Sequence, residues 1–256
     1  MNPDERGTHA YSFGNAASAY DDHRPDYPET AVRWALAPAP GNRVLDLAAG
    51  TGKLTRLLAG ICLDVTAVEP DDGMLAELRD NLPAVRSLRG PAEAIPLPDG
   101  SVDAVLVGQA LHWFDMERAG PEIARVLAPG GVLGALWNFD DDRVEWVKEL
   151  EAVAENTGGA TMSQWRSGDH EAHFVEISLP GLFAAPERAE FPHGQHRTAD
   201  SLTATIGTHS RLLMMDPADR ARVLSRVRDF LDARPETSAG EFSLPLVTAA
   251  IRAVRL

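Results

Sequence analysis

Short apolar runs alternate with amphipathic segments through the middle of the chain, with short links between them. The apolar runs predict buried strands, which lie at residues 43–47, 64–69, 84–88, 102–107 and 132–137. The segments between them predict helices at residues 53–58, 70–81 and 115–127. Strand and helix in alternation indicate an α/β fold, a doubly wound, Rossmann-like and mostly parallel sheet with helices on both faces.

The two flanks of this pattern carry other elements, which we interpret as parts of one domain over residues 1–256. Residues 1–40 predict a helical cap, with its clearest helix at 30–36, and residues 138–185 predict a lid insertion with a helix near 142–156. Residues 186–256 are expected to complete the sheet. Their predicted strands lie near 188–191 and 247–254, and their predicted helices at 202–215 and 218–233.

Composition and charge narrow the class of protein. The chain has 256 residues and a formal net charge of -14. An acidic surface repels a phosphate backbone, so nucleic acid is not an expected partner. The arginines at 220, 222, 226 and 228 are spaced round a helix and predict a solvated face. No stretch approaches the ~20 apolar residues of a membrane helix, and no secretory signal is recognisable at the start. Cys62 is the only cysteine, which fits a cytoplasmic protein.

A small-residue turn after the first predicted strand is the main candidate for chemistry. Residues 44–52 (VLDLAAGTG) run from a buried strand through Gly50 and Gly52 into a helix. Small residues let a backbone approach a ligand closely, at the strand end where doubly wound folds bind cofactors. Glu69, 19 residues after Gly50, ends the next strand, where an acid can accept both ribose hydroxyls of a nucleoside.

The turn and the acid by themselves fit either a dinucleotide or S-adenosylmethionine. A dinucleotide fingerprint that begins at Gly50 needs glycine or alanine at position 55, where Thr55 stands. That departure argues against a dinucleotide. A tight strand-to-helix turn without a ligand is the remaining alternative.

Four motifs together resemble the class I S-adenosylmethionine-dependent methyltransferases, in the small-molecule branch that includes ubiquinone-biosynthesis-like and trans-aconitate-methyltransferase-like enzymes. Residues 46–52 and 68–74 resemble the first and second family motifs. Residues 92–103 and 125–131 resemble the loop into the fourth strand and the turn before the fifth, and residues 20–28 resemble an N-terminal cap. The resemblance implies methyl transfer from S-adenosylmethionine to an O, N or C atom of a small molecule, with no metal.

The resemblance also implies a set of cofactor contacts. These are Tyr20, Arg24, Asp46, Ala48, Gly50, Gly52, Glu69, Pro70, Ala92, Glu93 and Gln109. Tyr20 and Arg24 are expected to close over the cofactor, the arginine pairing with its methionine carboxylate; the alternative is a surface pair on a helix. Two positions depart from the family: Ala48 stands where glycine is usual, and Pro91 stands where an acid often binds adenine. Adenine would then be held by backbone groups or by Ala92 and Glu93.

Residues 109–114 follow the fourth strand and border the transferred methyl in the resembled family. His112 is the candidate catalytic residue and a candidate substrate contact, since imidazole can deprotonate a hydroxyl or amine near neutral pH. Its alternative role is to orient the loop by a hydrogen bond. Trp113, Trp165 and His170 are further candidate substrate contacts, together with His173; core or lid packing is the alternative for each. His193 and His196 are expected to be exposed.

Two other functions stay open from the sequence. A protein of this fold can bind S-adenosylmethionine and catalyse a cyclisation or rearrangement, or it can bind the cofactor without turnover as a sensor or scaffold. The Asp46, Gly50, Gly52 and Glu69 set predicts cofactor binding in all these cases. The substrate and the oligomeric state are not encoded in a pattern that we can read.

Overall fold

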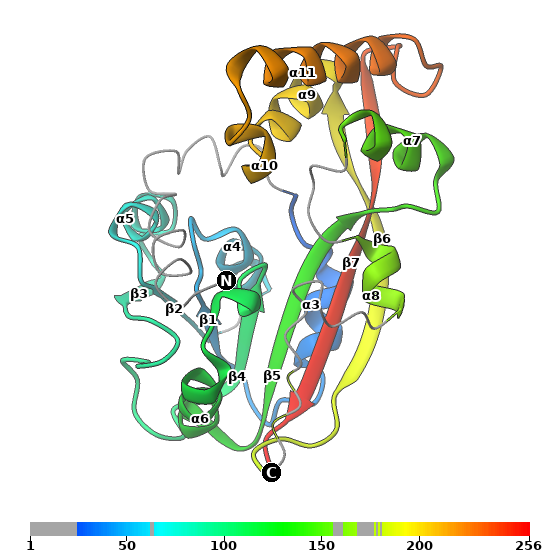
Figure 1. Cartoon of the computed structure of the whole chain (residues 1–256). Helices are drawn as coiled ribbons and strands as arrows, with labels where there is room; N and C mark the ends of the chain where they lie inside the picture. The colour runs from blue at the N-terminus through cyan, green and yellow to red at the C-terminus, as the bar shows by residue number, and fades with distance from the viewer. Residues whose placement is uncertain (1–24, 62–63, 156–160, 168–176, 178, 180) are drawn as a thin grey trace.

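In the residues that the computed structural model describes (25–61, 64–155, 161–167, 177, 179 and 181–256), seven strands form one sheet (Figure 1). The strand order is β3-β2-β1-β4-β5-β7-β6. β1 pairs in parallel with β2 and β4, β2 with β3, and β4 with β5, while β7 is antiparallel to both β5 and β6. This topology confirms the predicted doubly wound, mostly parallel fold.

The strands and helices of the described chain have the following bounds. The strands are β1 (Arg43–Leu47), β2 (Asp64–Glu69), β3 (Arg86–Arg89), β4 (Val102–Gly108), β5 (Leu127–Asp140), β6 (Glu187–Thr198) and β7 (Glu241–Val254). The helices are α3 (Glu29–Leu36), α4 (Lys53–Gly60), α5 (Asp72–Asn81), the 3-10 helix η2 (Leu111–Trp113), α6 (Met116–Val126), α7 (Glu145–Val153), α8 (Met162–Ser167), α9 (Ala199–Gly207), α10 (Ser210–Leu213) and α11 (Pro217–Asp232).

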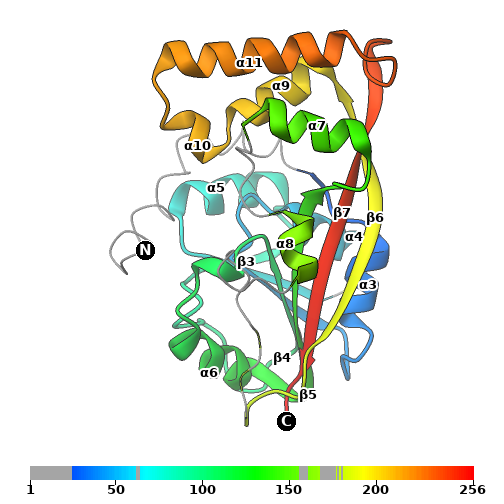
Figure 2. The same ribbon diagram turned by 45° about the vertical axis from the view of Figure 1, so that its right-hand side comes forward.

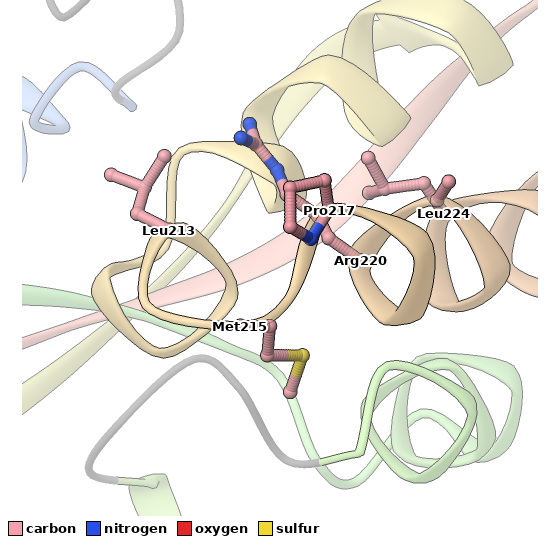
Figure 3. Close-up of a pocket in the computed structure, with 6 residues that line it drawn as sticks. Leu213, Met215, Pro217, Arg220 and Leu224 are labelled. Carbon is pink, nitrogen blue, oxygen red and sulfur yellow. The ribbon is translucent and has the colours of Figure 1, made fainter.

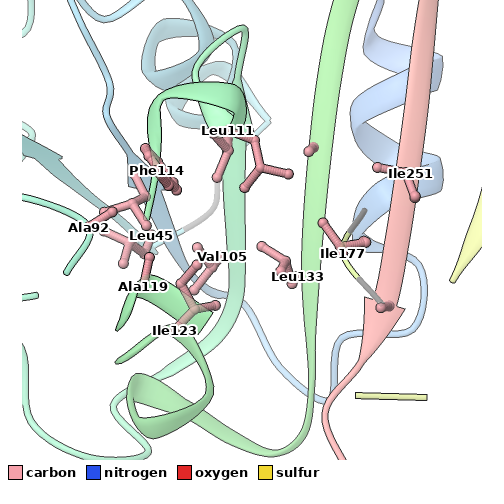
Figure 4. Packing of buried hydrophobic residues seen from close by; sticks show 14 of the residues in the cluster. Leu45, Ala92, Val105, Leu111, Phe114, Ala119, Ile123, Leu133, Ile177 and Ile251 are labelled. Atoms are coloured by element: carbon pink, nitrogen blue, oxygen red, sulfur yellow. The ribbon is translucent and has the colours of Figure 1, made fainter. Parts of the chain in front are cut away.

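Two hydrophobic clusters cover the two faces of the sheet. On one face, α6 and α8 pack on the strands through residues such as Ile123 and Trp165; Figure 4 shows Ile123 and Ala119 of α6 against Val105 and Leu45. On the other face, α3 and α4 pack through residues such as Val32 and Leu58. Because both faces are covered, the central parallel strands are mostly apolar, as the sequence predicted.

A third hydrophobic cluster lies beyond the sheet, under four helices that we call the cap helices (α7, α9, α10 and α11). β5, β6 and β7 are longer than β1 to β4. They continue past the carboxyl ends of those four strands and reach the cap helices (Figures 1 and 2). Trp146 of α7, Ile206 of α9, Val227 of α11 and Phe242 of β7 belong to this cluster, in which the rings of Trp146 and Phe242 lie 6.0 Å apart. The cap core therefore draws on both the 138–185 and the 186–256 segments.

Several element bounds differ from the sequence prediction. β5 begins at Leu127, because Leu127 pairs with Val102 before the Pro-Gly-Gly turn, and Gly130 takes a φ of 73° there. β6 extends to Thr198, because it pairs with β7 over its whole length. The single helix predicted over 202–215 is two helices, since α9 ends at Gly207, and the hydroxyl of the next residue, Thr208, donates to the Thr205 carbonyl.

Candidate active site

The turn after β1 combines left-handed backbone with close packing. Ala48, Gly50 and Gly52 all have positive φ, at 59°, 58° and 94°. A Cβ on Gly52 would lie 3.0 Å from Leu82 and 3.1 Å from Leu78, whereas one on Gly50 would have only the Met74 sulfur near it, at 3.7 Å. Glycine at 52 therefore serves packing as well as conformation, while glycine at 50 leaves the inner side of the turn open to a ligand.

Glu69 is bound to this turn through its side chain. Its Oε2 accepts a hydrogen bond from the Gly50 N–H at 2.8 Å, and its Oε1 accepts one from the Asp71 N–H at 2.9 Å. The side chain is buried, and burial raises its pKa while the two backbone donors lower it. Each carboxylate oxygen keeps a second lone pair, so Glu69 can still accept hydrogen bonds from a ligand.

Asp46 lies beneath the turn and carries an unsatisfied oxygen. Its Oδ2 accepts the Thr55 hydroxyl at 2.5 Å, whereas Oδ1 is buried without a hydrogen-bond partner within the described residues. Burial raises the pKa of Asp46 to about 7; the Thr55 hydrogen bond lowers it and the nearby Glu69 raises it. A buried carboxylate oxygen without a partner is costly unless a ligand satisfies it.

The residues expected around adenine have partners within the protein. Ala92 is buried in the hydrophobic cluster that includes α6, and the Glu93 carboxylate accepts the Asp115 N–H at 2.9 Å. Pro70 lies before Asp71, which caps α5 by accepting the Met74 N–H. The sequence placed Pro70 at the start of the helix, but α5 begins two residues later, at Asp72. The cofactor roles of Ala92, Glu93 and Pro70 stay predictions.

The loop after β4 holds the candidate catalytic histidine. Gln109 has a φ of 58°, and its N–H donates to the Leu136 carbonyl at 2.9 Å. His112 lies on η2, half-buried, with its ring 4.7 Å from that of Trp113 at 44°. Leu111 and Phe114 anchor the loop in the core (Figure 4). The structure thus places His112 and Trp113 just beyond the carboxyl end of β4.

The other candidate substrate contacts are less informative. Trp165 is 6% exposed, its ring lies 5.6 Å from that of Trp137, and the Arg188 guanidinium lies 5.1 Å from its centre. These contacts describe packing of α8 on the sheet. Tyr20, Arg24, His170 and His173 lie outside the described residues. His193, expected to be exposed, is half-buried, while His196 is exposed.

Sequence reasoning missed two polar residues in this region. Thr55 was read only as a departure from a dinucleotide fingerprint, but it is fully buried and binds Asp46. The signal was a polar residue on the apolar face of a helix, between Leu54 and Leu58. The second residue is Asn138, which ends the apolar run of β5 and bonds to a segment more than 100 positions away.

Comparison with known proteins identifies the chain. Residues 45–135 match the family described as "Methyltransferase domain". An uncharacterised methyltransferase of Mycobacterium bovis is 42% identical over 243 residues, which cover 94% of this chain and 95% of the relative. The chain belongs to the class I S-adenosylmethionine-dependent methyltransferases.

Solved structures agree with this methyltransferase assignment. A putative type II methyltransferase from Anaeromyxobacter dehalogenans superposes with a TM-score of 0.60 at 28% identity, over 91% of this chain and 97% of that one. A phosphoethanolamine N-methyltransferase of Haemonchus contortus, solved with S-adenosylhomocysteine, shares the fold with a TM-score of 0.55 at 15% identity. The superposition covers 99% of this chain and 60% of the Haemonchus chain.

Other features of the methyltransferase lie apart from the turn. A hollow of about 300 Å³ opens between α10 and α11, lined by Leu213, Met215, Pro217, Arg220, Ala221 and Leu224 (Figure 3), and it contains none of the predicted site residues.

In the described part of the chain, no group of three or more His, Cys, Asp or Glu side chains is arranged to hold a metal ion. No helix there is long and apolar enough to cross a membrane.

Proposed function

We propose that this methyltransferase binds S-adenosylmethionine at the turn after β1 and transfers its methyl group to a nucleophilic O, N or C atom of a small molecule. The observation that carries the proposal is the buried pair of acids at that turn. Glu69 is held by the Gly50 and Asp71 N–H groups, and Asp46 presents an oxygen without a partner in the described chain.

The residues present fit the cofactor. An acid with free lone pairs suits the two ribose hydroxyls, and the open inner side of Gly50 suits close approach of the ligand to backbone. The orphaned oxygen of Asp46 suits a cationic or N–H donor such as an amino group of the cofactor, directly or through water. Ala48, Gly52, Pro70, Ala92, Glu93 and Gln109, together with Tyr20 and Arg24, complete the proposed set.

When bound, the cofactor supplies a methyl group on a sulfonium, so that the new bond to the nucleophile forms as the carbon–sulfur bond breaks and S-adenosylhomocysteine leaves. The protein has two tasks, to align the nucleophile and to exclude water. The loop of Gln109, His112 and Trp113 lies at the carboxyl end of β4, where a substrate would meet the cofactor. His112 would accept the proton that a hydroxyl or amine substrate releases, or it would orient the loop.

A small-molecule substrate is supported by charge. The net charge of -14 disfavours a nucleic-acid substrate. The arginines of α11 form ion pairs with nearby acids, which neutralise much of the positive charge of that helix. Arg222 pairs with Asp219, Arg226 with Glu155, and Arg228 with Asp200 and Asp232. The lid role of residues 138–185 is supported by the position of α7 beyond the carboxyl end of the parallel strands (Figure 1). We also propose that the reaction takes place in the cytoplasm, which the single cysteine supports.

The experiment combines binding with turnover. We expect S-adenosylhomocysteine to bind the purified protein in a calorimetric titration. We also expect S-adenosylhomocysteine to be released from S-adenosylmethionine when a panel of small phenols, amines and carboxylic acids is added. Turnover only with added RNA, DNA or protein would overturn the small-molecule proposal. A titration without heat or saturation would overturn the cofactor site.

A further inference from the structure

Asn138, near the carboxyl end of β5, uses its whole side-chain amide to hold the segment before α3. Its Nδ2 donates to the Pro25 carbonyl at 3.3 Å and to the Asp26 carbonyl at 3.2 Å. Its Oδ1 accepts the Thr248 hydroxyl at 2.5 Å. Two donors and one acceptor are therefore all engaged, and the amide joins β5, β7 and the N-terminal segment.

The same segment contacts the start of the helix that follows the cofactor turn and the end of the neighbouring strand β4. The Asp26 carboxylate lies 3.3 Å from the Nζ of Lys53, the first residue of α4 after Gly52. The Tyr27 hydroxyl packs so closely on Gly108, at the end of β4, that a Cβ there would lie 2.6 Å from it. The segment thus spans from the start of α4 to the end of β4.

Asn138 also connects to the loop that carries His112. The Nε2 of Gln109 donates to the Asn138 carbonyl at 3.2 Å. On its other side, Thr248 contacts the Nε2 of His193 at 3.0 Å. Burial lowers the pKa of His193 more than the nearby Asp26 raises it. Asn138 therefore links residues 25–27 to the loop that carries His112 and, through Thr248, to strands β7 and β6.

The chemistry of the segment explains why an amide is needed. Pro25 and Pro28 have no N–H, so this stretch is poorly suited to pair as an edge strand. Its carbonyls are left free to accept hydrogen bonds from a side chain, and asparagine is a short side chain that offers two donors together with an acceptor. A carboxylate in the same place would set acceptors against two carbonyl oxygens.

We propose that Asn138 is a positioning residue for the cofactor: it fixes residues 25–27 against the start of α4 and the end of β4, and so sets the affinity for S-adenosylmethionine. This inference rests on the proposed function. It assigns Asn138 no contact with the cofactor, so its effect reaches the cofactor through the contacts of residues 25–27 with Lys53 and Gly108.

The test is Asn138→Asp, which keeps the shape of the side chain and removes both donors. We expect the Kd for S-adenosylhomocysteine at pH 8 to rise about tenfold or more, the effect of roughly one net hydrogen bond. The KM for the cofactor should rise while kcat changes less. Lowering the pH toward 5 should recover part of the affinity relative to wild type, since a protonated carboxyl donates one hydrogen bond again. Asn81→Asp, on the exposed end of α5, makes the same charge change and should leave the Kd unaltered.

Thr248→Val is the second variant, in case Asn138→Asp does not fold. It removes the hydroxyl that orients the amide and that also contacts His193, and we expect the Kd to rise about threefold to tenfold. A folded Asn138→Asp protein with wild-type Kd and KM would overturn the inference, as would a wild-type Kd for Thr248→Val if the first variant is unfolded. Wild-type protein that fails to bind S-adenosylhomocysteine at all would instead refute the proposed function.

Discussion

The carboxylate of Glu69 and the backbone N–H of Gly50 are joined by a hydrogen bond of 2.8 Å, across 19 residues of sequence. This bond ties the end of β2 to the turn after β1, and it orients the acid before any ligand arrives. The remaining lone pairs of Glu69 are the acceptors that we propose for the ribose hydroxyls. Preorganisation of this kind lowers the entropic cost of binding.

Replacement of Glu69 by alanine should weaken cofactor binding by about a hundredfold or more, since two charge-assisted hydrogen bonds of about 1.5–3 kcal/mol each are at stake. Isothermal calorimetry with S-adenosylhomocysteine gives the affinity, and circular dichroism checks the fold. Glu236→Ala, at an exposed position before β7, is the matched control. An unchanged affinity for Glu69→Ala would remove this residue from the site.

Ala48→Gly should stabilise the protein by about 1 kcal/mol, because alanine at a φ of 59° carries left-handed strain that glycine does not. The control is Ala37→Gly, where φ is -54° and the backbone is right-handed. That change should destabilise by about 0.5–1 kcal/mol through the added freedom of the unfolded chain. Urea unfolding of both variants measures the difference. Equal loss of stability in both would show that the turn is relaxed with alanine.

The stability of the unliganded protein should fall as the pH rises from 4 to 7. Asp46 has a pKa of about 7 in the folded protein, well above its ordinary value near 4. In that interval the folded state keeps a proton that the unfolded chain releases, so raising the pH favours unfolding. Each tenfold difference in proton affinity is worth about 1.4 kcal/mol. Asp140, with a pKa of about 6, and Glu151, at about 7, act in the same direction.

Asp46→Asn isolates the contribution of this one carboxyl. The variant cannot titrate, so its free energy of unfolding should fall less between pH 4 and 7 than that of wild type. Denaturant unfolding at several pH values measures both profiles, with exposed Asp80→Asn as the control. Parallel profiles for Asp46→Asn and wild type would show that Asp46 is charged in the folded protein throughout.

His112→Asn distinguishes a base from a positioning residue. As a general base, His112 should contribute about 10²–10⁴-fold to turnover. The kcat of the wild-type enzyme should then decrease at pH values below the pKa of His112. We expect the variant to lose turnover on that scale with a near-normal cofactor Kd. His196→Asn, on exposed β6, should behave as wild type. A His112→Asn enzyme that keeps its turnover and its pH profile would leave orientation as the role of the loop.

The core of the fold could be predicted because its signals are local. β1 and β2 occupy the predicted residues, since strands buried on both faces are mostly apolar. The outer strands could not be delimited in this way. Residues 193–196 of β6 (HGQH) are mostly polar, and it is their pairing with residues 243–246 of β7 that holds them extended.

The candidate site likewise contains residues that local sequence predicts and contacts that it does not. The turn and Glu69 were predictable, because small residues and an acid at a fixed spacing have a direct chemical reason. The partners of those residues were less so. Thr55 satisfies Asp46 from the next helix, and Asn138 meets Pro25 across 113 positions. Such contacts depend on how the strands are ordered in the sheet, which no local pattern specifies.

The hairpin of β6 and β7 has an evolutionary consequence. The outermost pair of its ladder joins Thr198 to Glu241, so residues 199–240 leave and return at neighbouring positions. Helices α9, α10 and α11 all lie within that excursion. A stretch closed at its base by a single strand pair can be lengthened, shortened or exchanged as a cassette without shifting the register of the sheet. Evolution can therefore remodel the helices beyond the sheet while the strands that carry the turn and Glu69 keep their register.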